Sequence, residues 1–147
     1  MFSKLLPVGS PAPAFILPDQ DGKLFDLDRH RNRNVVLIFY PADETPVCRA
    51  QLCEVRDRRP LVEQGNAIVV GINPGGAGSH QRFREKHGFP FPLLVDRGQR
   101  VAKLYHASGW ILLRRTVYLV GPDGSIRFAR RGKPTLEEVL AAAPPVL

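Results

Sequence analysis

The two cysteines of this 147-residue chain lie five positions apart, in the segment YPADETPVCRAQLCEVRD at residues 40–57. Thr45 followed by Pro46 predicts a helix start, because threonine suits the N-cap and proline the first helical position. Cys48 is then the third helical residue, where free backbone N–H groups and the helix dipole stabilise an anion. We therefore expect Cys48 to ionise readily and to act as a nucleophile. A small buried residue that only packs at a helix start is the plainer alternative.

The spacing of Cys53 from Cys48 favours the chemical interpretation. On one continuous α-helix the two residues are roughly 140° apart around the axis, and their Cα atoms are roughly 8 to 9 Å apart. A disulfide requires Cα atoms less than about 7 Å apart. The two sulfurs thus cannot bond while the helix is wound, but they can bond once it unwinds. The spacing is typical of thiols that are separate in one state and joined in another.

The elements on either side of this segment would hold it at the edge of a sheet. Val35 to Phe39 is an unbroken apolar run that predicts a central strand covered on both faces. Its end would deliver Tyr40 and Pro41 to the edge where open α/β sheets place their sites. Pro60 predicts a kink or two helical pieces, and Gly65 the end of the second. Residues 67–72 are the next expected buried strand.

The rest of the chain alternates short predicted strands and helices. Asp21-Gly22 predicts a hairpin between residues 15–17 and 24–27, after an extended arm at residues 1–14. The polar residues 28–34, with His30, are expected to form a surface loop. Ser79 is the predicted cap of a helix that Gly88 ends, and Thr135 with Glu138 predicts a capping box for a last helix at 136–143. Further segments follow as a strand at 93–95, a helix at 100–105, the stretch 110–113, and a hairpin of strands 115–120 and 126–130.

The cysteine segment resembles the peroxiredoxin active-site motif Pro-x-x-x-Thr-x-x-Cys, filled by Pro41, Thr45 and Cys48. Cys53 is placed like the resolving cysteine of the bacterioferritin-comigratory (PrxQ) subgroup. The resemblance covers about residues 5 to 142, and its other segments are NVVLIFYPAD, VVGINPGGAGSHQRF, FPFPLLVDRGQRVAKLY and RTVYLVGPDGSI. The family usually has Gly before the reactive cysteine, Thr after it and Glu two residues further on, where this chain has Val47, Arg49 and Gln51.

The resemblance implies a single-domain α/β protein, residues 1–147, with a thioredoxin-like fold and an N-terminal β-hairpin extension. It implies reduction of hydrogen peroxide and organic hydroperoxides through a Cys48 sulfenic acid and a Cys48–Cys53 intramolecular disulfide. Thr45 and Arg115 would stabilise the transferred charge, and Pro41 would shield the thiolate. Because side chains alternate along a strand, a slip of one residue would exchange Arg115 for Arg114. The resemblance requires no metal or organic cofactor, and thioredoxin or glutaredoxin would be the reductant.

Composition limits the partners and the compartment. The formal net charge of +7 admits nucleic acid as a partner, but the arginines are scattered and no nucleic-acid-binding motif is present. No apolar run approaches the roughly 18 residues of a membrane span, and no signal peptide is recognisable. Two cysteines close together in one segment indicate a reducing compartment, where a disulfide between them would be transient. We expect a cytoplasmic protein, a monomer or weak homodimer, without nucleic-acid or membrane partners.

Two other functions remain open from the sequence. A thiol-disulfide oxidoreductase on the same fold would normally use a Cys-x-x-Cys spacing, which this chain lacks. A copper-binding protein would need both cysteines and a histidine, for which His80, His87 and His106 are available. The glycine-rich loop NPGGAG lacks the spacing of a phosphate-binding motif and predicts a plain strand-to-helix connection. The apolar stretch Phe89-Pro90-Phe91-Pro92 would lie near the active-site pocket of the resembling family, although core packing explains its rings.

Overall fold

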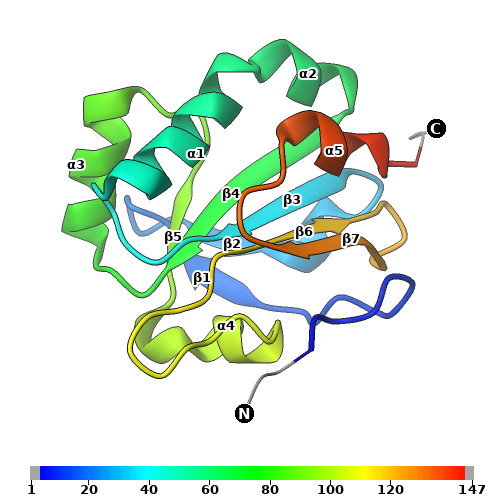
Figure 1. Ribbon diagram of the computed structural model, residues 1–147, viewed down its shortest axis with the longest axis horizontal. Coiled ribbons are helices and arrows are strands. Elements are labelled where there is room, and N and C mark those ends of the chain that lie inside the picture. The colour runs from blue at the N-terminus through cyan, green and yellow to red at the C-terminus, as the bar shows by residue number, and fades with distance from the viewer. Residues whose placement is uncertain (1–3, 145–147) are drawn as a thin grey trace.

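The computed structural model describes residues 4–144 and has a five-stranded mixed sheet at its centre (Figure 1). The strand order is β5-β4-β3-β6-β7. The central strand β3 (Asn34–Phe39) pairs in parallel with β4 (Ala67–Asn73) and antiparallel with β6 (Thr116–Val120). Outside them lie β5 (Leu93–Val95), parallel to β4, and β7 (Ile126–Arg131), antiparallel to β6.

All six residues of β3 are buried, because the sheet is covered on both faces. Val35, Leu37 and Phe39 belong to one hydrophobic cluster, whereas Val36 and Ile38 belong to a second. This alternation is the two-residue period of a strand. The unbroken apolar run of the sequence is therefore a strand shared by two cores.

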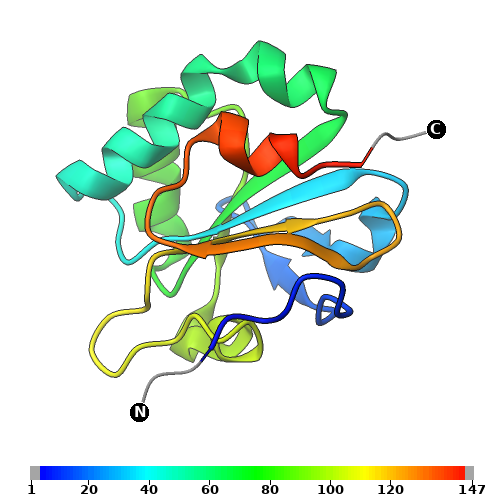
Figure 2. The same ribbon diagram turned by 45° about the vertical axis from the view of Figure 1, so that its right-hand side comes forward.

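Each core lies under its own set of elements (Figures 1 and 2). Residues of four helices pack with Val36 and Ile38, and these helices are α1 (Pro46–Asp57), α2 (Arg59–Gln64), α3 (Ala77–His87) and α5 (Leu136–Ala141). The other core joins the helix α4 (Arg100–Leu104) to a separate antiparallel hairpin, β1 (Ile16–Pro18) and β2 (Leu24–Asp26). Short 3₁₀ helices cover Leu27–His30 and Arg97–Gln99.

Several local predictions are confirmed. The Asp21-Gly22 turn joins β1 to β2, and α2 begins next to Pro60, so that two helical pieces replace one. Gly88 ends α3 with a φ of 63°, a left-handed conformation that favours glycine. Thr135 and Glu138 form the predicted capping box.

Other local predictions are wrong. Ser79 is not the cap of α3, because the helix begins two residues earlier, at Ala77, with Gly76 as its N-cap. Residues 28–34 are not all surface loop, since the first of them continue a 3₁₀ helix capped by Asp26, and Asn34 opens β3 with 1% of its surface exposed. The predicted strand 115–120 is present as β6 but begins one residue later, at Thr116, and residues 110–113, for which no element was predicted, form a loop. The last helix ends at Ala141, two residues early.

No helix within residues 4–144 is both long enough and apolar enough to cross a membrane.

Candidate active site

Cys48 is the third residue of α1, which begins directly after the loop that follows β3. Thr45 is the N-cap in an extended conformation and Pro46 is the first helical residue, as predicted. The Thr45 hydroxyl does not cap the helix; it donates to the Ala42 carbonyl at 3.4 Å. The first turn is therefore closed by main-chain bonds such as Arg49 N–H to the Thr45 carbonyl, 2.8 Å. The first turn therefore lacks a side-chain cap.

Arg115 contacts the sulfur of Cys48. Its Nη2 donates to Cys48 Sγ at 3.0 Å, and its Nη1 donates to Oε1 of Gln51 at 2.9 Å. Arg115 lies just before β6, and its carbonyl accepts from Gly132 N–H at 2.8 Å, which ties it to the end of β7. The neighbouring Arg114 has its own main-chain N–H bonded to the Ala107 carbonyl and lines a hollow beside Trp110. Arg115, and not Arg114, is thus the arginine at the sulfur.

Gln51 is a site residue that the sequence interpretation named only as a departure from the family pattern. It is 4% exposed and lies one helical turn after Cys48, so both side chains are on one face of α1. As a neutral amide, Gln51 orients the guanidinium without cancelling its charge. The sequence signal that could have identified Gln51 is its spacing of three residues from Cys48, which places both side chains on one face of a helix.

Cys48 itself has no exposed surface and belongs to the core cluster beneath α1. The chemical interpretation requires that the sulfur is not enclosed by hydrocarbon alone, and the guanidinium of Arg115, a partly exposed residue, meets this requirement. Pro41 and Thr45 are also partly exposed. The sulfur is therefore not open to solvent in the state that the structure shows.

Cys53 lies five residues later in the same continuous helix and is partly buried. Both cysteines are free thiols. The structure thus shows the separated, helical state that the spacing predicts, with the second sulfur packed against the same core.

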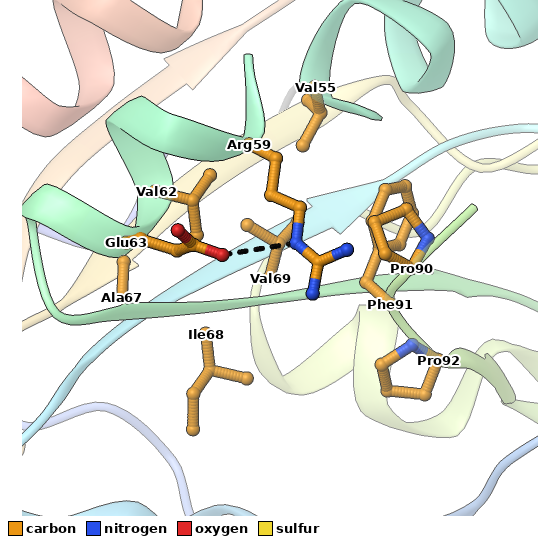
Figure 3. Close-up of a pocket in the computed structure, with 10 residues that line it drawn as sticks. All are labelled: Val55, Arg59, Val62, Glu63, Ala67, Ile68, Val69, Pro90, Phe91 and Pro92. Atoms are coloured by element: carbon orange, nitrogen blue, oxygen red, sulfur yellow. Dashed lines mark hydrogen bonds and ion pairs between the residues drawn. The ribbon is translucent and has the colours of Figure 1, made fainter. Parts of the chain in front are cut away.

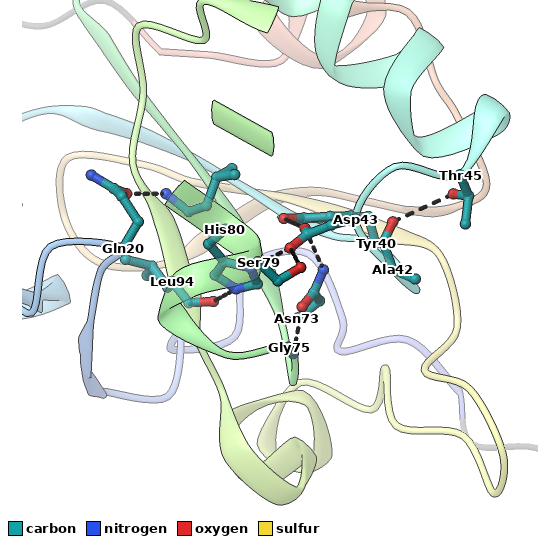
Figure 4. A network of polar contacts seen from close by, with 11 residues as sticks. Gln20, Tyr40, Ala42, Asp43, Thr45, Asn73, Gly75, Ser79, His80 and Leu94 are labelled. Atoms are coloured by element: carbon teal, nitrogen blue, oxygen red, sulfur yellow. Dashed lines mark hydrogen bonds and ion pairs between the residues drawn. The ribbon is translucent and has the colours of Figure 1, made fainter. Parts of the chain in front are cut away.

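A buried polar network fixes the loop between β3 and α1 (Figure 4). The Asp43 carboxylate accepts hydrogen bonds from the Tyr40 hydroxyl and the Asn73 amide at one oxygen, at 2.7 and 3.1 Å. Its other oxygen contacts the Ser79 hydroxyl and His80 Nδ1 at 2.7 and 2.6 Å. Four partners from β4, α3 and the end of β3 therefore saturate one carboxylate. The loop that carries Pro41 and Thr45 is anchored to the body of the fold.

The pKa values of two groups reflect this network. Burial would raise the pKa of Asp43, but the hydrogen bonds from His80 and Tyr40 outweigh it and hold that pKa below its usual range. Burial, together with the neighbouring Asp43 charge, raises the pKa of Tyr40 well above its ordinary value. The Tyr40 hydroxyl therefore remains a donor to Asp43 at neutral pH.

The glycine-rich loop belongs to the same network. Gly75 N–H donates to Oδ1 of Asn73 at 2.7 Å, and a Cβ at Gly75 would lie only 2.9 Å from that oxygen. Glycine is needed here for a close approach of the main chain. The loop connects β4 to α3, as predicted.

The three histidines considered as copper ligands are engaged elsewhere. His80 is fully buried between Asp43 and the Leu94 carbonyl, His87 contacts Glu44, and His106 contacts the Lys4 carbonyl. No group of three or more His, Cys, Asp or Glu side chains among residues 4–144 is arranged to hold a metal ion. The geometry gives the copper alternative no support.

A surface hollow of about 220 Å³ lies beside α2, the start of β4 and residues 90–92 (Figure 3). Apolar side chains dominate its lining, with the Arg59–Glu63 ion pair among them, and its residues are Val55, Arg59, Val62, Glu63, Ala67, Ile68, Val69, Pro90, Phe91 and Pro92. Cys48 is not among them. Phe89 and Phe91 are buried and stacked in the core, so core packing accounts for the rings of the Phe-Pro-Phe-Pro stretch.

Comparison with known proteins gives consistent relatives. Residues 8–129 match the model of the AhpC/TSA family. A chloroplastic peroxiredoxin Q of Triticum aestivum is 46% identical over 123 residues, which are 82% of this chain and 57% of the wheat protein. A putative peroxiredoxin, bcp, of Coxiella burnetii is 32% identical over 127 residues, 81% of this chain and 84% of that protein. The chain thus spans little more than half the length of the plant relatives.

The fold has close counterparts among solved structures. The crystal structure of peroxidoxin BcpB from Mycobacterium tuberculosis superposes with a TM-score of 0.85 at 28% identity, covering 92% of this chain and 94% of BcpB. The expected thioredoxin-like α/β fold is confirmed.

Proposed function

The chain belongs to the AhpC/TSA family, and on this premise we propose that it is a thiol-dependent peroxidase that reduces hydrogen peroxide and organic hydroperoxides through Cys48. The observation that carries the proposal is the 3.0 Å contact between Arg115 Nη2 and Cys48 Sγ at the start of a helix. A guanidinium stays charged at any physiological pH, so it can stabilise a thiolate and a departing oxygen alike. The relatives named peroxiredoxin support the same chemistry.

In the first step the Cys48 thiolate attacks one oxygen of the peroxide. The S–O bond forms as the O–O bond breaks, and the second oxygen leaves with a proton as water or an alcohol. Arg115 and the free N–H groups of the first turn of α1 face the charge that passes to the leaving oxygen. Thr45 would add a hydroxyl to this set, and Pro41 would cover the thiolate. Cys48 is left as a sulfenic acid.

In the second step Cys53 resolves the sulfenic acid. The first turns of α1 unwind, the Cys53 sulfur displaces water from Cys48, and an intramolecular disulfide forms. The Thr45 hydroxyl makes no bond that holds the first turn, which favours this unwinding. An external dithiol of thioredoxin or glutaredoxin type would then restore both thiols by exchange. The cycle is that of an atypical two-cysteine enzyme in a reducing compartment such as the cytoplasm.

The test compares the two cysteine variants by peroxide consumption and by mass spectrometry after one equivalent of peroxide, with free thiols blocked. Cys48→Ser should lose peroxidase activity. Cys53→Ser should complete one turnover and then stop unless an external thiol is supplied. Parental peroxide consumption by the Cys48→Ser protein would refute the proposal. A parental protein without a bond between Cys48 and Cys53 after oxidation would refute the resolving step alone.

A further inference from the structure

The loop between α4 and β6 presents three large apolar side chains to solvent. Trp110 is 99% exposed, Ile111 84% and Leu112 60%. Figures 1 and 2 show this loop as a protrusion at the lower left of the molecule. Single exposed apolar residues are ordinary, but three in succession at a loop tip indicate an interaction surface.

Hydrogen bonds and packing at the base of the loop fix its conformation. Ala107 and Leu113 are buried on either side of the tip, and Arg114 N–H donates to the Ala107 carbonyl at 2.7 Å, which closes the base. The Gln99 side chain accepts from Gly109 N–H at 2.9 Å. A Cβ at Gly109 would lie 1.7 Å from the Leu112 carbonyl oxygen, so only glycine permits this tight turn. The three side chains thus project because the fold anchors both ends of the loop.

The surroundings of the tip are positively charged. Residues 97–122 contain no aspartate or glutamate, and the cations that lie beside Trp110 are Lys103 and Arg114. Lys103 and Arg114 line, together with Trp110, a surface hollow of about 570 Å³. A second copy of the chain would bring these like charges together, while an anionic partner would be attracted by them.

The size of the tip distinguishes between anionic partners. A stable protein interface buries about 800 Å² on each side. Each large side chain of the tip can bury at most about 250 Å², so three of them reach less than that area. Three protruding apolar groups beside two cationic side chains suit the boundary between headgroups and acyl chains, where tryptophan is favoured.

We propose that residues 107–114 dock the protein on an anionic lipid bilayer, with Trp110, Ile111 and Leu112 inserted at the interface and Lys103 and Arg114 facing phosphate headgroups. The sequence-based expectation of no membrane partner relied on the absence of a spanning segment, which interfacial docking does not need. Thr116 pairs with Phe39, so the loop meets the sheet at the end where α1 begins. If the proposed peroxidase function holds, docking brings the Cys48 site close to acyl-chain hydroperoxides.

The binding test uses the emission of Trp110, the only tryptophan of the chain. Vesicles of phosphatidylcholine containing phosphatidylglycerol should shift the emission to the blue, protect it from an aqueous quencher and sediment the protein. Pure phosphatidylcholine vesicles should do none of these, and high salt should weaken the effect. The variant Ile111→Ser/Leu112→Ser keeps the fluorophore and should bind at least about tenfold more weakly, because it loses most of the inserted apolar area.

The matched control is Val8→Ser/Leu24→Ser, which removes two apolar side chains that are 63% and 67% exposed outside the loop. It should bind like the parent. Absence of a blue shift with anionic vesicles, or equal loss in control and loop variant, would overturn the proposal. A blue shift that grows with protein concentration without lipid would overturn it in favour of a second copy. Cys48→Ser should bind vesicles normally, so failure of docking and failure of the peroxidase function are separable.

Discussion

Oε1 of Gln51 lies 2.9 Å from Nη1 of Arg115, on the guanidinium whose other terminal nitrogen contacts the Cys48 sulfur. The three side chains form one line of contacts from α1 to the start of β6. Because Gln51 is almost fully buried, it limits the positions that the guanidinium can occupy. Arg115 is therefore oriented toward the sulfur before any substrate arrives.

Gln51→Leu should slow the oxidation of Cys48 without removing any charge from the site. Leucine fills a similar volume but accepts no hydrogen bond, so Arg115 would be free to turn from the sulfur. Because a small misplacement of a catalytic group is costly, we expect a rate loss of about tenfold. The measurement is single-turnover oxidation of Cys48 in the Cys53→Ser background. A matched Gln51→Glu variant keeps the acceptor and should lose less, so equal losses in the two variants would contradict the orienting role.

Arg115→Lys should cost more, because lysine retains the charge but cannot contact Gln51 and the sulfur together. Removal of one oriented donor at a developing charge typically costs about 10² in rate. Arg49→Lys is the control, since Arg49 is an exposed arginine of α1, the helix that carries Cys48. Stopped-flow measurement of the peroxide step should separate the two variants. A rate for Arg115→Lys equal to that of Arg49→Lys would show that charge alone suffices.

Elements with local signals could be predicted from the sequence. The boundary at Pro60, the left-handed Gly88 and the Thr135 capping box each depend on residues close in the chain. The start of α3 was missed because Ser79 has the composition of a cap, while its hydroxyl bonds Asp43, 36 residues away. No local pattern reveals such a contact.

The same distinction holds for the site. The motif and the helix position identified Cys48, and the family resemblance supplied Arg115. The Asp43 network was not predicted, because it forms only when the ends of β3 and β4 meet the first turn of α3. Trp110 and its neighbours could not be assigned to the surface either, since an apolar stretch normally predicts burial.

Asp43→Asn should destabilise the fold by about 3 kcal/mol at pH 7, because it removes a buried carboxylate that four partners satisfy. The pKa of Asp43 is lowered in the folded protein, so the charged carboxylate stabilises the fold above its unfolded pKa of about 4. This contribution is lost as the pH falls through the lower folded value. The difference between parent and variant should therefore shrink below about pH 4. Urea unfolding at several pH values measures it, and a difference independent of pH would contradict the assignment.

Two glycines should respond in opposite directions to the same substitution. A Cβ at Gly71, inside β4, would lie 2.8 Å from Leu93 Cδ2 and 2.9 Å from Tyr40 Cε1. Gly71→Ala must displace these two fully buried side chains, and overpacking of this kind costs about 1 to 3 kcal/mol. Gly78 lies within α3, where a Cβ meets only the flexible end of Arg82 at 3.3 Å.

Gly78→Ala should therefore stabilise the protein by about 0.5 to 1 kcal/mol, since alanine loses less conformational freedom in a helix than glycine. Thermal unfolding of both variants beside the parent gives the comparison directly. Because Tyr40 donates to Asp43, its displacement in Gly71→Ala should also slow the oxidation of Cys48, whereas Gly78→Ala should leave that rate unchanged. A lowered melting temperature with a parental oxidation rate in Gly71→Ala would show that the strand tolerates the strain without passing it to the loop before α1.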